Sequence, residues 1–385
     1  MNVMSPHGAT PVIGDVTILN GVKIVEITTA VSAPLIGRVL AEMGAEVVKV
    51  ESRAKVDVNR ARVPRPSDPE GFPAHEAFQL LHEASASKES VTLNMKTDRG
   101  RQLFLELLTD ADVFIENFVP GWLDRLDLPI EQLRERFPQL VILSASGYGQ
   151  TGPLRTQRSY APVMTALAGI EGLIGYEDGQ VMGCSALALA DLNCTFNGVF
   201  LVMAALAGRE STGQGTHIDL SQIEAVSTLA GEAFVEHQLR GTQPGAVGNQ
   251  EPDGTRWSLQ QSGENDGWVA ARTPASLSAT SGPRPSRTEL LETLRARGIE
   301  SAPILSPQQV ASDDRFTSRG FTQDVQHPHS AIGELTVTSI PWRVEGTVPR
   351  IRRAAPMLGA SNAKILGRYA QTAELAELED QGVLK

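Results

Sequence analysis

The sequence predicts an α/β protein with a doubly wound, Rossmann-like large domain and a smaller second domain. Short β-branched runs alternate with amphipathic helical segments between residues 22 and 149. Strands separated by single helices run parallel in one sheet, and such sheets bind ligands at the carboxyl ends of their strands. The length of 385 residues favours two domains, because one hydrophobic core stops growing at roughly 250–300 residues.

The first β-α-β unit lies between residues 22 and 51. VKIVEIT at 22–28 and EVVKVE at 46–51 are short, β-branched runs typical of strands. Between them, RVLAEMGAE places apolar residues at positions 39, 40 and 43, which is the spacing of a helix face. Gly44 follows, and glycine commonly ends a helix.

The same alternation continues to residue 149. SVTLNM at 90–95 and DVFIEN at 112–117 predict strands on either side of the amphipathic helix GRQLFLELLTDA at 100–111. A helix at 131–139 and the strand-like run LVILSASGYG at 140–149 follow. The loops that we expect to meet ligands therefore come after residues 28, 51, 96, 116 and 146.

The second half of the chain is less regular. An apolar, small-residue-rich stretch at 162–208 ends in a helix, and THIDLSQIEAV at 216–226 predicts a strand that enters another helix. Residues 240–290 are rich in Gly, Pro, Ser and Thr, which indicates a loop or a reduced second domain. A helix and a strand are predicted at 289–305, and a further strand at 333–346. We therefore expect a flexible lead-in at 1–15, a large domain at 16–215, a small domain with linkers at 216–335 and a C-terminal return to the large domain at 336–385.

Composition and charge argue against several classes of function. The formal net charge of −11 does not suit a nucleic-acid-binding protein, because neutralising phosphates requires a basic surface. No apolar run approaches the roughly 20 residues that span a bilayer, and the first residues lack the pattern of a secretory signal. Cys184 and Cys194 form no metal-ligand pattern with any histidine, so we expect no metal site and a reducing, cytoplasmic setting. The sequence has neither a GxGxxG run after the first strand nor a GxxxxGK[ST] loop, which argues against a dehydrogenase or a kinase.

Asp191 ends the stretch CSALALAD, in which small and apolar side chains predominate. Burying an unpaired carboxylate costs several kcal/mol, so an acid in such surroundings has a definite role. Two roles are open from the residues alone. The side chain either caps a helix or takes part in chemistry.

Candidate ligand contacts follow several of the predicted strands. ENFVPGWLDRL at 116–126 puts Asn117 and Phe118 directly after a buried strand, where they either belong to a turn set by Pro120 and Gly121 or meet a ligand. Four cations occupy comparable places. Each alone is typical of a solvated surface, but together they can bind a phosphorylated cofactor. They are Arg53, Lys96, Arg125 and Arg158.

A series of stretches, weak singly but specific in their order and spacing, runs over nearly the whole chain. They are LNGVKIVEIT, SAP, LAEMGAEVVKVE, SVTLNMKTDRGRQLF, ADVFIENFVPG, SGYGQTGP, ALALAD, ALAGRESTGQGTHIDLSQIEA and RRAAPMLGASNAKIL. In them the sequence resembles the class III CoA-transferases, which include formyl-CoA:oxalate and carnitine CoA-transferases, and the related 2-methylacyl-CoA racemases. The resemblance implies coenzyme A as a substrate, a catalytic aspartate on a loop of the larger domain, and two chains interlocked like links.

By this resemblance Asp191 falls on the nucleophile of the transferases, which follows a DG turn, here Asp178 and Gly179. In such enzymes the carboxylate attacks an acyl-CoA thioester to give a mixed anhydride. CoA then returns to form an aspartyl-CoA thioester, and an acceptor acid completes the exchange. We expect the small apolar flank to keep water away from Asp191, and backbone donors to keep its carboxylate ionised.

The same matching predicts where CoA binds. The residues are Ser32, Ala33, Leu93, Lys96, Asn117, Phe118 and Arg125, with Arg158 where the family keeps another cation and Arg53 added from the cations above. Lys96 and Arg125 would pair with CoA phosphates, while Phe118 would offer an apolar wall. Position 119 is Val where relatives often carry Arg, and the glycine-rich loop that covers the site in some relatives is not recognisable.

Two alternative functions remain beside the transferase. The chain is either active by itself or a non-catalytic subunit beside an active paralogue, so the expected assembly is a homodimer or a heterodimer of like chains. A racemase would need a carboxylate shortly after SGYGQTGP, where this sequence has Ala161, and alanine cannot abstract a proton. The resemblance implies an acyl-CoA donor and a carboxylic acid acceptor, without nucleic acid or membrane partners.

Overall fold

The computed structural model describes residues 11–61, 64–65, 67–265, 267–274 and 283–385. The described chain divides into two compact units. The first comprises the segments within Met1–Ala168, Ala186–Thr228 and Thr317–Lys385, and the second those within Gly169–Ser185 and Leu229–Phe316. These bounds differ from the expected ones, because the chain enters the second unit once before residue 186 and again after residue 228.

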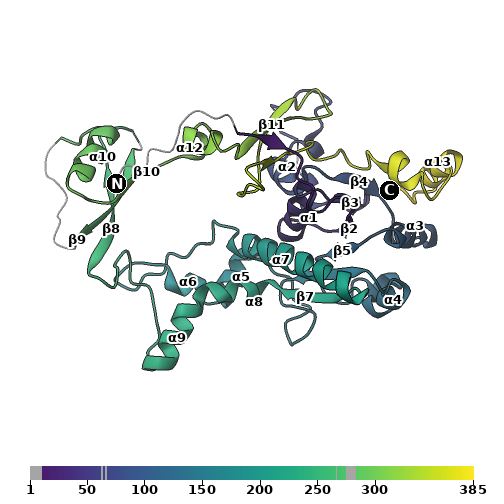
Figure 1. Cartoon of the computed structure of the whole chain (residues 1–385), viewed down its shortest axis with the longest axis horizontal. Coiled ribbons are helices and arrows are strands. Elements are labelled where there is room, and N and C mark those ends of the chain that lie inside the picture. The colour runs from purple at the N-terminus through teal and green to yellow at the C-terminus, as the bar shows by residue number, and fades with distance from the viewer. Residues whose placement is uncertain (1–10, 62–63, 66, 266, 275–282) are drawn as a thin grey trace. The chain divides into compact units, whose positions relative to one another are not determined.

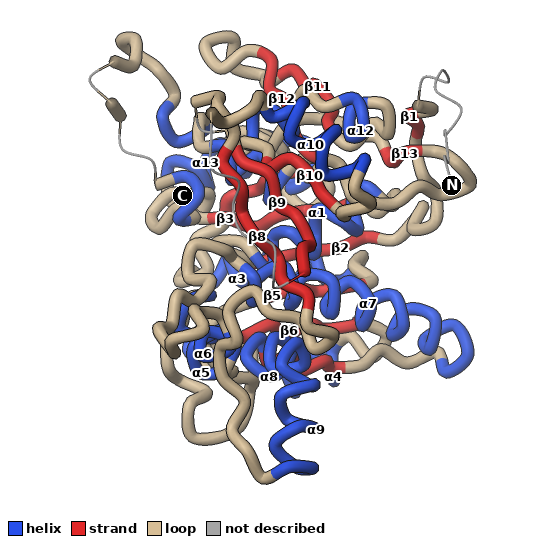
Figure 2. The backbone as a smooth tube through the Cα atoms, turned by 90° about the vertical axis from the view of Figure 1, so that its left-hand side faces the viewer, coloured by secondary structure: helices blue, strands red, loops and turns tan. Residues whose placement is uncertain are grey.

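A six-stranded parallel sheet forms the centre of the first unit, as the sequence predicts. Its strand order is β4-β3-β2-β5-β6-β7, and every neighbouring pair is parallel. Figure 2 shows β3, β2, β5 and β6 in succession. The strands are β2 (Lys23–Ile27), β3 (Glu46–Glu51), β4 (Glu89–Thr92), β5 (Val113–Glu116), β6 (Val141–Ser146) and β7 (His217–Ser221).

Helices cover both faces of this sheet because its strands are apolar on both sides. In β2, Val25 and Ile27 face one core and Ile24 faces the other. The first core receives α3 (Asp98–Thr109), α4 (Ile130–Arg136) and α13 (Thr372–Asp380). The second receives α1 (Ser32–Glu42), α7 (Leu189–Thr212) and α8 (Gln222–Ser227) (Figure 1). The doubly wound arrangement thus follows from strands buried on both faces.

Helix α7 packs closely on α1 because Gly198 lies at their contact. A Cβ atom at Gly198 would lie 2.3 Å from Ile36 Cδ1, so a larger residue would have to displace the buried Ile36 side chain. Among the described residues, α7 is also the one helix long and apolar enough to cross a membrane, with a mean hydropathy of 1.5. A third of that apolar stretch is buried, and Cys194, Val199 and Val202 of α7 lie in the core to which α1 also contributes.

The smaller elements of the first unit border this sheet. Residues 1–10 of the expected lead-in lie outside the described residues, whereas β1 (Ile13–Gly14) is not a free lead-in, because it pairs in parallel with β13 (Val348–Pro349). An antiparallel pair, β11 (Thr322–Gln326) and β12 (Glu334–Thr338), belongs to the C-terminal segment. The short helices α2 (Gln79–Ser85) and α5 (Ala161–Leu167) complete this unit.

The second unit contains an antiparallel sheet of order β10-β9-β8. Strands β8 (Thr255–Gln261) and β9 (Trp268–Pro274) fall within the stretch 240–290, so that stretch belongs to a reduced second domain and is not only a loop. Strand β10 (Ser301–Ile304) and helix α10 (Arg287–Ala296) form the helix and strand predicted at 289–305. Other helices are α6 (Ile170–Leu173), α9 (Gly231–Arg240) and α11 (Pro307–Ala311), while α12 (Asp314–Thr317) spans the boundary of the two units.

Candidate active site

The carboxyl ends of the parallel strands bring the predicted site loops to one edge of the sheet. The strand order reverses between β2 and β5, and this switch point is where ligands bind in open α/β sheets. The loops after β2 and β5 are joined there by Asn117. Its Oδ1 accepts the Thr29 N–H at 2.9 Å, and its Nδ2 donates to the Thr29 carbonyl at 2.9 Å.

The loop after β2 is fixed by further side chains. Asp57 Oδ1 accepts the N–H of Ala30 at 3.2 Å, and Asn59 Nδ2 donates to the Ala30 carbonyl at 2.5 Å. Lys49 Nζ donates to the Thr28 carbonyl at 2.7 Å. Ala30 has φ of 65°, a left-handed conformation that costs energy for a residue with a Cβ. These bonds hold the loop in that conformation and so fix the direction in which α1 begins.

Asp191 lies in the first turn of α7 and meets the start of α1. The backbone N–H and the hydroxyl of Ser32 lie close enough to its carboxylate to favour the ionised form. Burial raises the pKa of Asp191 above its ordinary value, and these two groups of Ser32 oppose that rise. The predicted backbone donor is therefore present, and the carboxylate is half-buried at the positive end of the α1 dipole.

Two expectations about Asp191 are wrong in detail. The N-cap of α7 is Ala188, so Asp191 is not the capping residue, and it lies inside the helix and not on a loop. Three of the apolar residues before it, Ala186 to Ala188, are exposed, with Leu187 63% accessible, whereas Leu189 is half-buried and Ala190 is buried. Their side chains do not desolvate the carboxylate within this chain. Its burial comes instead from the side of α1, where Ser32 and Ala33 are buried.

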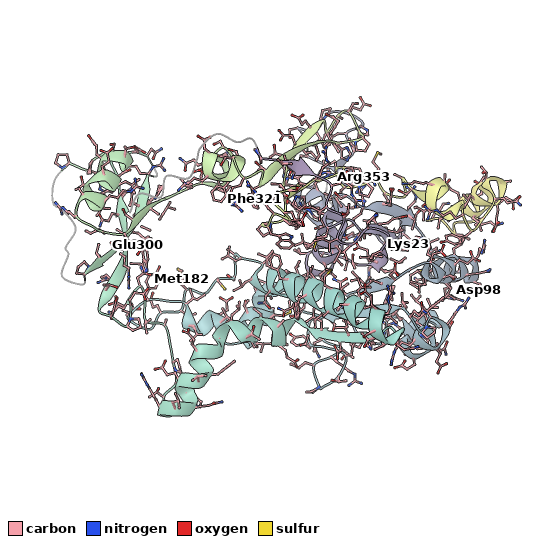
Figure 3. All side chains as sticks on the ribbon, viewed as in Figure 1. Lys23, Asp98, Met182, Glu300, Phe321 and Arg353 are labelled. Atoms are coloured by element: carbon pink, nitrogen blue, oxygen red, sulfur yellow. The ribbon has the colours of Figure 1, made fainter. Side chains whose placement is uncertain are left out.

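Arg53, Leu93 and Lys96 follow β3 and β4. Arg53 is exposed and its Nη2 donates to the Leu358 carbonyl at 3.4 Å. Leu93 is fully buried in the core, so its side chain supports the loop and does not reach the surface. Lys96 is exposed, two residues before the start of α3 at Asp98, which is labelled in Figure 3.

Phe118 and Arg125 follow β5, on the loop that Asn117 begins. Phe118 is half-buried and stacks on Trp122, with ring centroids 4.1 Å apart. Arg125 is exposed within a short 3-10 turn. Both side-chain amide atoms of Asn117 are engaged by Thr29, which gives this residue a role in joining the two loops.

The loop after β6 leads to Arg158 and Ala161. Arg158 is exposed before α5, and Ala161 is the buried first residue of that helix. Within the described part of the chain, no hydrogen bond or ion pair links Arg53, Lys96, Arg125 or Arg158 to Asp191. The cations therefore share the edge of the sheet with Asp191, whereas Ser32 touches it directly.

Sequence reasoning missed three polar residues around this edge. Gln222 opens α8, and its Nε2 donates to Ser32 Oγ at 3.1 Å. Thr195 Oγ1 donates to the backbone carbonyls of Asp191 and Ser32, at 2.8 and 3.1 Å. Glu116 ends β5. A polar residue at the junction between a strand and the following element was the available signal, and both Gln222 and Glu116 show it.

Glu116 is a buried acid directly before the loop that carries Asn117 and Phe118. Its Oε2 accepts the Phe118 N–H at 2.9 Å, and Ser144 of β6 also bonds to it. Burial raises the pKa of Glu116 to about 7, and the nearby charge of Asp219 adds to that rise. The protonation state of Glu116 therefore changes near neutral pH.

Replacing Glu116 by Gln is expected to remove a pH dependence of stability. The pKa of Glu116 is about 7 in the folded protein and 4.5 in the unfolded chain. The stability that Glu116 contributes is therefore fully present below pH 4.5 and is lost as the pH rises through 7. Urea unfolding at pH 4.5 and 7.5 should show the wild type losing about 3 kcal/mol relative to Glu116→Gln. Parallel pH profiles for the two proteins would contradict this expectation.

The described residues show no cluster suited to a metal ion. No group of three or more His, Cys, Asp or Glu side chains among them has a geometry that could hold one.

Comparison with known proteins shows which proteins this chain resembles. A model of CoA-transferase family III matches residues 19–281 and 276–362. The acetyl-CoA:oxalate CoA-transferase of Acetobacter aceti is 33% identical over 236 residues, which span 60% of this chain and 58% of that protein. The succinate–glutarate CoA-transferase of Agrobacterium fabrum is 26% identical over 90% of this chain and 94% of its own length.

A solved structure extends the similarity to three dimensions. The crystal structure of a CAIB/BAIF family protein from Brucella suis superposes with a TM-score of 0.79 and 26% identity. The match covers 94% of this chain and 100% of that one. The resemblance drawn from the motifs is thereby confirmed at the level of sequence and of fold.

Proposed function

The chain belongs to CoA-transferase family III, and we propose that it moves CoA from an acyl-CoA donor to a carboxylic acid acceptor with Asp191 as the nucleophile. The observation that supports this most is the placement of Asp191. Its half-buried carboxylate meets two donors from Ser32 at the start of α1, at the carboxyl edge of the sheet. Partial burial favours reactivity, because a fully hydrated carboxylate is a weak nucleophile.

The exchange proceeds by covalent steps at the Asp191 carboxylate. One Oδ attacks the thioester carbonyl, the C–S bond breaks, and CoA leaves as a thiolate, which gives a mixed anhydride. The thiolate then attacks the aspartyl carbonyl, which releases the donor acid and forms an aspartyl-CoA thioester. The acceptor carboxylate attacks this thioester, and the returning thiolate takes the acceptor acyl group. Asp191 is free again, and no water is consumed.

The loops around the edge are proposed to bind CoA. Lys96 and Arg125 are exposed cations that suit the phosphates, with Arg53 and Arg158 as further cations on neighbouring loops. Phe118, stacked on Trp122, offers an apolar surface. Ser32, Ala33, Leu93 and Asn117 shape the loops beneath. The names of the two relatives support a dicarboxylic acid as one substrate.

We infer that two chains assemble into the active form, in the cytoplasm. An apolar stripe on α7 supports the assembly: Leu192, Phe196 and Phe200 recur every four residues and are 47%, 45% and 69% exposed. The exposed apolar residues at 186–188 precede this stripe, next to Asp191. A partner chain that covers them would exclude water from the site and so protect the anhydride from hydrolysis.

Trapping the covalent intermediate tests the proposal. The purified chain is incubated with succinyl-CoA or acetyl-CoA, treated with hydroxylamine and digested for mass spectrometry. We expect a hydroxamate at Asp191 in the presence of acyl-CoA and none in its absence. Exchange of CoA onto oxalate or glutarate by the chain alone would exclude the role of an inactive subunit. No adduct and no exchange would contradict the proposal, and exchange of the 2-hydrogen of a 2-methylacyl-CoA would favour a racemase.

A further inference from the structure

Gln222 is a buried amide that contacts the residue touching Asp191. It begins α8 immediately after β7, and its side chain is only 6% exposed. Its Nε2 donates to Ser32 Oγ at 3.1 Å, while its Oε1 has no hydrogen-bond partner among the described residues. Leaving a buried carbonyl oxygen unpaired is unfavourable, so the orientation of this amide must bring a compensating gain.

The orientation of the Gln222 amide determines which group the Ser32 hydroxyl can donate its proton to. A serine hydroxyl has one proton to donate and two lone pairs that accept. Gln222 Nε2 is a donor and occupies one lone pair. Cys194 also lies within hydrogen-bond reach of Ser32, and burial with the Asp191 charge raises the pKa of its thiol to about 12, so the sulfur stays protonated and competes only weakly as an acceptor for the Ser32 proton.

The ionised Asp191 carboxylate is then the acceptor left for the Ser32 proton. It has no proton of its own, and both the N–H and the hydroxyl of Ser32 favour its ionised form. If the Gln222 amide were turned, its Oε1 would face Ser32 Oγ and would accept that proton in place of Asp191. The observed orientation therefore preserves the second donor of the carboxylate.

We propose that Gln222 is a positioning residue of the transferase site, whose amide commits the Ser32 hydroxyl proton to the Asp191 carboxylate. This rests on the proposed function, in which Asp191 is acylated and must leave again as an anion. A donor fixed on the carboxylate stabilises that anion each time the anhydride or thioester breaks. The effect passes through Ser32, so Gln222 itself touches no substrate.

Two substitutions at position 222 test the role by pH profile. Gln222→Met removes the donor at similar size, so the acid limb of single-turnover CoA exchange should move to higher pH by about half a unit to one unit, with kcat about tenfold lower. Gln222→Glu has nearly the same shape but only accepts, so it should lower kcat about a hundredfold. KM for acyl-CoA should stay within about twofold in both.

Few other titratable groups affect the acid limb of the pH profile of CoA exchange. Cys194 is the titratable side chain of α7 that is coupled to Asp191, and no charged residue among those described on α1 or α8 contributes to the Asp191 pKa. Gln323→Met is the matched control: this glutamine is also buried, but it bonds to Pro349 and Ile351 in the C-terminal segment. It should lower the melting temperature and leave the acid limb unchanged.

A double-mutant cycle separates positioning from mere packing. In Ser32→Ala there is no hydroxyl to orient, so adding Gln222→Met should cost less than twofold in kcat. The inference would be overturned if Gln222→Met lowered kcat equally in the wild type and in Ser32→Ala. It would also be overturned if the acid limb were unshifted in both Gln222 variants. If hydroxamate forms at Asp191 in the wild type while the cycle is additive, the transferase proposal stands and only the role of Gln222 is lost. If no hydroxamate forms, the proposed function itself fails.

Discussion

Asp191→Asn is expected to lower CoA exchange by about three orders of magnitude or more while the fold is retained. The change keeps the size of the side chain and one carbonyl oxygen. The two donors of Ser32 therefore still find an acceptor, and the first turn of α7 is preserved. What is lost is the anionic oxygen that would attack the thioester.

The measurement compares CoA exchange, CoA binding and the melting temperature in Asp191→Asn and the wild type. Asp324→Asn provides a matched control, because Asp324 is an exposed carboxylate on β11 that accepts from Thr336 Oγ1 at 2.6 Å. The control should keep full activity. CoA affinity should stay within about twofold in Asp191→Asn, since no CoA phosphate is assigned to that side chain. Full exchange activity in Asp191→Asn would remove the residue from the mechanism.

The parallel sheet could be predicted because its strands and helices carry strong local patterns. VKIVEIT and EVVKVE gave β2 and β3 to within a few residues, and LVILSASGYG gave β6. Burial on both faces makes such strands nearly continuous apolar runs, which are readable without tertiary information. The parallel direction of the strands followed from the alternation with helices, whereas their order in the sheet required the fold.

Strands β8 and β9 could not be predicted with the same ease. TRWSLQQ at 255–261 and WVAARTP at 268–274 alternate weakly, and glycine- and proline-rich segments surround them. Their burial pattern explains this, since β8 has no fully buried residue and β9 buries only every second one. A small sheet that is only partly buried leaves little hydrophobic signal in its sequence.

The start of α7 was likewise hidden. Its N-cap is Ala188, which has no side chain to bond the first N–H groups, so nothing in CSALALAD marks where the helix begins. The contact between Asp191 and Ser32 joins residues far apart in the chain, and local spacing carries no information about it. The family resemblance supplied the proposed role of Asp191, whereas its contact with Ser32 and the position of Gln222 required the fold.

Lys49→Met is expected to lower the free energy of unfolding by about 3–5 kcal/mol. Lys49 lies inside β3 with no exposed surface, and its Nζ is 3.0 Å from Asp57 Oδ2 and 3.9 Å from Glu26 Oε1. Glu26 keeps a second cation, Lys88, at 2.7 Å. Asp57 has no other cation among its described partners, so the substitution leaves a buried charge that only N–H and hydroxyl donors meet.

The same change should loosen the loop that precedes Ser32. Lys49 Nζ donates to the carbonyl and the hydroxyl of Thr28, at 2.7 and 3.1 Å, and Thr28 begins that loop. Methionine has a similar length but no donor, so the Thr28 carbonyl loses this partner. Amide hydrogen exchange at residues 28–31 should therefore become faster in Lys49→Met, beyond the change expected from global stability.

The stability gap between Lys49→Met and the wild type should narrow in acid. Burial opposes ionisation of Asp57, but Lys49 and backbone donors outweigh it and hold the pKa of Asp57 below 3.8. The stability that a lowered carboxyl pKa provides is present above the pKa of the unfolded chain. It is lost as the pH falls through the pKa of the folded protein. The free energy of unfolding of both proteins is measured in urea between pH 2.5 and 7. Lys55→Met is the control, because Lys55 is exposed and its replacement should change stability by less than about 0.5 kcal/mol.

A second test removes the charge of the buried partner. In Asp57→Asn that partner is already neutral, so adding Lys49→Met should lower the free energy of unfolding by less than it does in the wild type. An equal cost in both backgrounds would show that Lys49 stabilises the sheet by packing alone.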